Sequence, residues 1–218
     1  MLYIFDMGGV VTTTAAVVEK IALILGITEA EFMSICGCPE GNRSYGKPHE
    51  RAASDNGFNL ITMYSNGLLS AKEFWRLFSA RSGISVTTDW WHFLFHPESN
   101  ENIRRVIGEL KKRGERVVCG TNTIESHYLN HLERGDYSIF DQTYASCFMG
   151  VSKPDVNFWK IILTAEDVEA KDAFFVDDRI ENCEAAASLG INTFHFDFAD
   201  GKNGSDCISA LKKAVGLD

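Results

Sequence analysis

The sequence contains no hydrophobic run that approaches the ~20 residues of a membrane span. No basic region precedes its first apolar run, which is also too short for a secretory signal peptide. Zinc-type cysteine spacing is absent too, because Cys36 and Cys38 are the only close pair among six cysteines. We therefore expect a cytoplasmic protein that has no membrane partner and whose cysteines are all unpaired thiols.

The sequence also lacks a basic stripe. Its formal net charge is −9, and its densest positive run is Lys111-Lys112-Arg113. That run ends a predicted helix, where cations meet the negative end of the helix dipole. The pattern argues against nucleic acid as a partner, and an anionic substrate must be held by local groups rather than by the overall field.

The hydrophobic content of 45% and the length of 218 residues suit one large domain with an insertion. Helix and strand patterns alternate between residues 98 and 196, which predicts an α/β fold with a doubly wound parallel sheet. The expected strands are residues 2–5, 116–121, 142–146, 173–177 and 193–196. The expected helices are residues 103–110, 124–134, 154–163, 180–189 and 205–215.

Residues 14–96 break this alternation, with helical patterns and almost no strand pattern. Val17, Ile21 and Ile24 share one helical face, and Ser70 with Glu73 forms a capping box that opens a second helix. We interpret residues 14–96 as a helical cap domain. It is inserted after the first strand of a core domain formed by residues 1–13 and 97–218.

The first predicted strand ends on a carboxylate. Leu2 to Phe5 have the pattern of a buried strand, and Asp6 follows directly, with Gly8 and Gly9 behind it. An Asp-Gly turn would account for this pattern without any function. A carboxylate at the rim of a sheet can instead serve as a nucleophile, a metal ligand or both, and glycines let the backbone approach a ligand.

Two further predicted strands end on Thr121 and Asp177. Ligands of open parallel sheets bind at the carboxyl ends of strands, so these side chains converge with Asp6 if the three strands are neighbours. Asp177 and Asp178 alone would suit an ordinary helix cap. With Asp6 they form a cluster of carboxylates that repels itself unless a cation binds, and oxygen ligands suit Mg²⁺. Asn182, one turn later, is placed to orient Asp178.

Thr121-Asn122 and Lys153 add groups that a phosphate needs. The Thr121 hydroxyl and the next backbone N–H could bind a phosphate oxygen, although this pair also suits a helix cap. Lys153 lies in a turn before Pro154, from which its ammonium can reach inward. A lysine and Mg²⁺ together neutralise the negative charge of a phosphoryl group.

Together, these segments resemble the motifs of the haloacid dehalogenase-like (HAD) hydrolase superfamily. The resemblance rests on Asp6-Met7-Gly8-Gly9-Val10, Thr121-Asn122, Lys153-Pro154 and Asp177-Asp178-x-x-x-Asn182. It implies that Asp6 is a nucleophile that forms an aspartyl-phosphate, and that Thr121 and Lys153 hold the phosphoryl oxygens. It implies an Mg²⁺ site made by Asp6, the Gly8 carbonyl and Asp178, with Asp177 close by. The insertion then resembles the C1 cap of the subgroup that includes α-glucose-1-phosphate phosphatase and the epoxide hydrolase N-terminal domain.

One position departs from the superfamily pattern. A second Asp usually stands two residues after the nucleophile, as the general acid and base, and here that position is Gly8. Glycine cannot transfer a proton, and losing such a group typically costs ~10²–10⁴-fold in rate. The sugar-phosphatase subgroup also has glycine there, and His49 in the predicted cap is a candidate replacement.

Three functions are compatible with these residues. The favoured one is an Mg²⁺-dependent phosphatase that acts on a small phosphorylated metabolite such as a sugar phosphate. A metal-free 2-haloacid dehalogenase has no need of the acidic pair Asp177-Asp178. A catalytically impaired binding protein is supported only by Gly8.

Overall fold

The computed structural model describes residues 1–38, 59–196 and 204–217. Its described residues form one parallel five-stranded sheet with the order β3-β2-β1-β4-β5. The strands are β1 (Leu2–Phe5), β2 (Arg116–Thr121), β3 (Gln142–Ala145), β4 (Ala173–Asp177) and β5 (Asn192–His195). The chain builds outward from β1 through β2 to β3 and then returns to the other side of β1 with β4. The doubly wound α/β fold is therefore confirmed.

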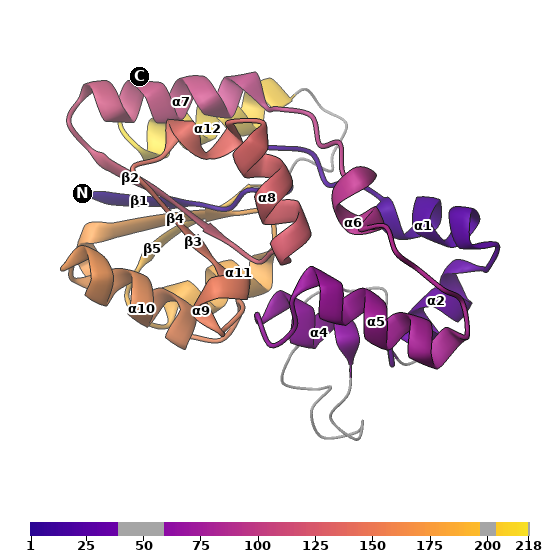
Figure 1. Cartoon of the computed structure of the whole chain (residues 1–218). Coiled ribbons are helices and arrows are strands. Elements are labelled where there is room, and N and C mark those ends of the chain that lie inside the picture. The colour runs from indigo at the N-terminus through magenta and orange to yellow at the C-terminus, as the bar shows by residue number, and fades with distance from the viewer. Residues whose placement is uncertain (39–58, 197–203, 218) are drawn as a thin grey trace.

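Alternating side chains of the strands face two separate hydrophobic layers. Tyr3 and Phe5 of β1 pack under α7 (Glu101–Lys112) and α12 (Gly204–Ala214), whereas Leu2 and Ile4 pack against α10 (Asn157–Glu166) and α11 (Ile180–Ala187). Figure 1 shows α7 and α12 on one side of the sheet and α10 and α11 on the other. Because both faces are covered, the central strands β1 and β4 are buried and almost entirely apolar, whereas the edge strands β3 and β5 carry polar residues.

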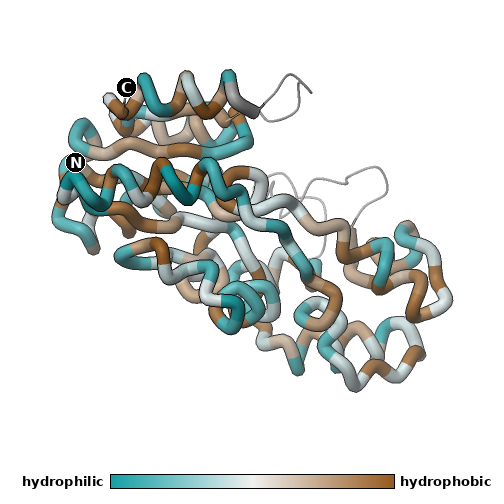
Figure 2. Tube along the Cα trace, turned by 90° about the horizontal axis from the view of Figure 1, so that it is seen from above, coloured by the Kyte–Doolittle hydropathy of each residue, from teal (hydrophilic) through white to brown (hydrophobic). Residues whose placement is uncertain are grey.

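Between β1 and α7, five helices of the described residues lie beyond the carboxyl ends of the strands (Figures 1 and 2). They are α1 (Val17–Leu25), α2 (Glu29–Ile35), α4 (Leu60–Ser65), α5 (Ala71–Ser82) and α6 (Trp90–Phe93). Their buried side chains form most of a third hydrophobic cluster, rich in aromatic rings, to which Ile124 alone contributes from outside residues 14–96 among the described residues. Both chain termini lie at the opposite end of the molecule.

The remaining short elements connect the sheet to its helices. They are α8 (Glu125–Glu133), α9 (Ser146–Met149) and the 3-10 helices η1 (Asp136–Ile139) and η2 (Ala170–Asp172). In the described residues, no helix has the length and apolar character needed to cross a membrane. All six cysteines are thiols.

Local details differ from the sequence expectation at two positions. The helix expected from Pro154 begins only at Asn157, whose backbone N–H donates to the Asp155 side chain at 2.9 Å. Ile24 was expected on the buried face of the first helix, but it is 47% exposed, and Ala22 is buried instead. The capping box of Ser70 and Glu73 is confirmed at the start of α5. His49 lies outside the described residues.

Candidate active site

The three polar strand ends converge because β1 lies between β2 and β4. Asp6 follows β1, its backbone N–H donates to the carbonyl of Val176 at 2.9 Å, and Asp177 ends β4 one residue later. Thr121 ends β2 on the other side of β1. Asp6, Thr121 and Asp177 are all buried. The three strands are thus neighbours, which was the condition for their end residues to converge.

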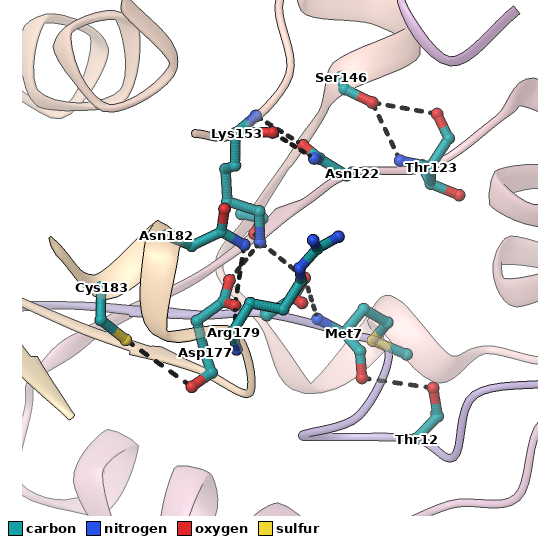
Figure 3. Close-up of polar contacts among 12 residues, drawn as sticks. Met7, Thr12, Asn122, Thr123, Ser146, Lys153, Asp177, Arg179, Asn182 and Cys183 are labelled. Atoms are coloured by element: carbon teal, nitrogen blue, oxygen red, sulfur yellow. Dashed lines mark hydrogen bonds and ion pairs between the residues drawn. The ribbon is translucent and has the colours of Figure 1, made fainter. Parts of the chain in front are cut away.

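Lys153 lies at the centre of this cluster and is almost completely buried, with 1% exposure. Its Nζ is 2.9 Å from Oδ1 of Asp6 and 2.7 Å from Oδ2 of Asp177, and it donates to the carbonyl of Gly120 at 2.8 Å. Figure 3 shows the side chain extending from its loop toward Asp177. The ammonium therefore reaches inward, as the sequence predicted.

Asn122 holds the backbone of Lys153 in place. Its amide donates to the Lys153 carbonyl and accepts from the Lys153 N–H, both at 2.8 Å. Figure 3 shows this paired contact. The side chain of Asn122 therefore positions Lys153. If Asn122 binds phosphate, it would do so through its backbone N–H.

Both carboxylate oxygens of Asp177 accept hydrogen bonds from protein partners. In addition to Lys153, its carboxylate accepts hydrogen bonds at 2.9 Å from the Arg179 backbone N–H and from the Asn182 amide. Asn182 was expected to orient Asp178. This is wrong, because the Asn182 amide, in the first turn of α11, donates to Asp177 at the end of β4 instead. Asp177 thus positions Lys153 directly.

Asp6 and Asp178 retain oxygens that a cation can use. One oxygen each from Asp6, Asp177 and Asp178 lies within 4.8 Å of the others. Oδ1 of Asp6 accepts from the Met7 N–H at 2.8 Å and contacts Lys153, which leaves Oδ2. In the described part of the chain, Asp178 bonds to no other side chain, and no N–H donates to the Gly8 carbonyl. These oxygen donors suit Mg²⁺.

Gly9 allows Asp178 to approach the loop after β1. Its φ of +81° is in the left-handed region, and a Cβ built there would lie 2.2 Å from Oδ2 of Asp178. Gly8 has no such restriction, because nothing lies within 4 Å of the corresponding Cβ position. The two glycines therefore serve different purposes.

The electrostatics of the cluster favour an added cation. Burial raises the pKa of Asp6 to about 7; the nearby Lys153 opposes the shift, and the charges of Asp177 and Asp178 add to it. Burial and the charge of Asp177 also raise the pKa of Asp178. Burial lowers the pKa of Lys153, but the carboxylates of Asp177 and Asp6 outweigh it and raise the pKa above its ordinary value. Lys153 balances only one of three carboxylates, so a divalent ion fits the remaining charge.

A family model of haloacid dehalogenase-like hydrolases matches residues 1–190. The chain belongs to this family. Its fold is similar to a HAD family enzyme from Bacteroides thetaiotaomicron, solved with magnesium and inorganic phosphate, at a TM-score of 0.70 and 19% identity over 93% of this chain and 97% of that one. It is also similar to a HAD-like hydrolase from Porphyromonas gingivalis, at a TM-score of 0.72 and 22% identity over 96% of each chain.

Curated relatives match over shorter segments. The sesquiterpene phosphatase astK of Aspergillus oryzae is 34% identical over 92 residues, which is 41% of this chain and 46% of the relative. The drimenol cyclase drtB of Aspergillus calidoustus is 34% identical over 119 residues, 54% of this chain and 20% of the relative. This HAD-family chain thus spans less than half the length of either relative.

Proposed function

We propose that this HAD-family hydrolase is an Mg²⁺-dependent phosphatase that cleaves a small phosphate ester through an aspartyl-phosphate. The observation that carries the proposal is the placement of Asp6. Its carboxylate lies at the carboxyl edge of the sheet, 2.9 Å from the Lys153 ammonium and within 4.8 Å of the acidic pair Asp177 and Asp178. The names of astK and of one fold neighbour, a HAD phosphatase from Thermococcus onnurineus, point in the same direction.

Each residue then has a role in the first step. Asp6 attacks phosphorus through its carboxylate, and the P–O bond to the alcohol breaks. Lys153 and the Thr121 hydroxyl hold the phosphoryl oxygens, because both lie at the same edge of the sheet as Asp6. Asp6, Asp178 and the Gly8 carbonyl would hold Mg²⁺, which supplies positive charge that stabilises the transition state.

Water then hydrolyses the aspartyl-phosphate and regenerates Asp6. The usual acid and base is absent because position 8 is glycine. The alcohol must therefore be protonated by water, by the substrate or by a group of the cap. Lys153 is held between Asp6 and Asp177, which raise its pKa, so it is a poor proton donor at neutral pH.

We propose that residues 14–96 are a C1 cap, attached to the core formed by residues 1–13 and 97–218. Both connections lie beside the site, since the segment begins shortly after Asp6. Polar contacts join the two parts: the Ala71 N–H donates to Glu125 at 2.7 Å, and Ser146 donates to the Ser65 carbonyl at 2.8 Å. Further polar contacts join Asn66, Asp89 and His92 to the core, and a lid that opens for the substrate would exchange such contacts as it moves.

The experiment that tests this function is a panel of phosphate monoesters, assayed with and without Mg²⁺. We expect hydrolysis that requires Mg²⁺ and is lost in Asp6→Asn, because an amide keeps the shape of the carboxylate but is a far poorer nucleophile and metal ligand. Robust turnover by Asp6→Asn, or turnover in excess chelator, would contradict the proposal. Release of halide from a 2-haloacid without metal would favour the dehalogenase function instead.

A further inference from the structure

A cavity of about 230 Å³ lies between the helical segment and the site. Gly8 and Thr121 line its core side, beside the proposed nucleophile. The surface of the cavity is mostly apolar and includes Met7, Val17, Ile61, Trp91, Phe95 and Ile124, although Thr, Ser, Asn and His side chains also line it. The cavity is therefore placed to receive the organic part of a substrate whose phosphate is at Asp6.

The described residues that line this cavity include no Asp, Glu, Lys or Arg. Two histidines contribute, and burial disfavours the charged form of both. Burial lowers the pKa of His127 to about 3, and burial also lowers the pKa of His131 below its ordinary value. A second phosphate, a carboxylate or an ammonium on the substrate would thus lose its hydration without gaining a charged partner.

Many polar groups in the wall are already bonded within the protein. The Asn122 amide is paired with the Lys153 backbone, and the Ser152 hydroxyl donates to the Asn66 side chain. Thr13 accepts from the Glu98 N–H at 2.9 Å. Among the described residues, the hydroxyls of Thr14, Thr62 and Ser65 remain for a substrate. A sugar with a hydroxyl on every carbon needs more partners than these three, and each unpaired hydroxyl would weaken binding.

We propose, on the basis of the proposed phosphatase function, that the substrate is the phosphate monoester of an uncharged, mainly hydrocarbon alcohol. The phosphate lies at Asp6, Thr121 and Lys153, and the hydrocarbon group fills the cavity between Val17, Trp91 and Ile124. Hydrolysis transfers the phosphoryl group to Asp6 and then to water, and it releases the alcohol and inorganic phosphate. This differs from the sugar phosphate that the sequence suggested.

The test compares kcat/KM for n-hexyl phosphate and glucose 6-phosphate in the presence of Mg²⁺. Both are primary alkyl monoesters, so the chemistry of bond cleavage is closely matched and the organic group decides the difference. We expect kcat/KM to rise about twofold to fourfold for each methylene from propyl to hexyl phosphate. We expect hexyl phosphate to exceed glucose 6-phosphate by at least ~10-fold. Equal values, or a preference for the sugar, would overturn the inference.

Adjacent valines of α1 supply a matched pair of variants. Val17 lines the cavity, whereas Val18 is buried in the same helical cluster away from it. Val17→Thr keeps the shape of the side chain and should reduce the hexyl-to-glucose ratio by about fourfold, the value of one lost methyl contact. Val18→Thr should leave that ratio unchanged. An equal effect of both variants would show that the hexyl-to-glucose ratio depends on the stability of the helical cluster. That result would contradict the proposal that the cavity binds the hydrocarbon group.

Acetyl phosphate separates this inference from the function on which it rests. Its small leaving group does not fill the cavity, so its Asp6-dependent hydrolysis tests the phosphatase alone. If acetyl phosphate is hydrolysed without an alkyl preference, only the inference fails. If it is not hydrolysed, calorimetric binding of hexylphosphonate and methylphosphonate with Mg²⁺ decides: at least ~10-fold tighter binding of the hexyl compound supports the cavity, and equal binding refutes it.

Discussion

Adjacent glycines at positions 8 and 9 differ in what a side chain would meet. Gly8→Ala should change the free energy of unfolding by less than about 1 kcal/mol, because its Cβ would lie in open space. Gly9→Ala should cost about 1–3 kcal/mol, because its φ is +81° and its Cβ would collide with Asp178. Chemical denaturation of both variants measures the difference, and similar losses would contradict this reading of the loop.

The glycine at position 8 also predicts how the rate depends on the leaving group. If no acid protonates the departing alcohol, the chemical step should fall steeply as the alcohol pKa rises. Gly8→Asp restores a carboxyl group where space permits it, and should raise turnover on alkyl phosphates by up to ~10²-fold while changing aryl phosphates little. Single-turnover rates on both ester classes test this. A flat dependence in the natural protein would mean that another group supplies the proton.

Most elements of the core could be predicted from the sequence because their signals are local. Apolar runs such as Ala173 to Val176 and glycines such as Gly114 and Gly190 set the bounds of strands and helices within one or two residues. The start of α10 could not, because Pro154 is compatible with a first helical turn and the Asp155 side chain decides the start instead.

The candidate site was predictable at its strand ends and less so in its contacts. Asp6, Thr121 and Asp177 follow buried strands, so their convergence needs only the strand order. The partners of Lys153 and of Asn182 depend on side-chain directions, which a linear pattern does not contain. The cavity was not predicted at all, because residues as distant as Val17 and Ile124 form it together.

Asp136 of η1 is bonded to His131 of α8 and to Arg134 at the end of that helix. These contacts predict that the free energy of unfolding decreases in acid. Burial tends to raise the pKa of Asp136, but hydrogen bonds from His131, at 2.8 Å, and Arg134, at 3.0 Å, outweigh it and lower the pKa below 3.8. Because the folded pKa is the lower one, the stabilisation is present above pH 3.8 and is lost as pH falls through the folded pKa. The pKa of His131 is lowered as well, so protonation of this histidine also reduces the free energy of unfolding as the pH falls below 6.5.

Asp136→Asn should therefore destabilise the protein by about 1–3 kcal/mol at neutral pH, and by less in acid. Urea unfolding at several pH values measures this, with Glu184→Gln on the exposed face of α11 as the control. A penalty that stays constant down to the lowest pH would show that the charge of the Asp136 carboxylate does not contribute to the stability of the folded protein.

At the scale of the whole molecule, the helical segment is joined to the core around Ser126 of α8. The Tyr64 hydroxyl bonds to the Ser126 hydroxyl, which in turn donates to Asp89. The Ser126 N–H also donates to the Tyr64 hydroxyl at 3.0 Å. Tyr64 of α4 and Asp89, the N-cap residue of α6, thus both bond to one serine of the core. A movement of the proposed cap would therefore change this buried hydrogen-bond network.

Hydrogen exchange tests whether the proposed cap moves as a lid. Phosphate with Mg²⁺ should slow exchange in the described cap residues 59–96 and leave α10 unchanged, because α10 packs against the sheet and lines no part of the cavity. Ser126→Ala should speed exchange in α4 before any ligand is added. Exchange that is the same at saturating ligand and in the variant would argue against a moving lid.

The identity of the group that attacks phosphorus is the central claim, and rapid-quench mass spectrometry tests it most directly. A reaction with acetyl phosphate and Mg²⁺, quenched in acid within one turnover, should yield a phosphorylated peptide whose modification lies on Asp6. The modification should form before free phosphate and disappear as phosphate accumulates. Phosphate release with an Asp6 peptide that is unmodified at every time point would contradict the account.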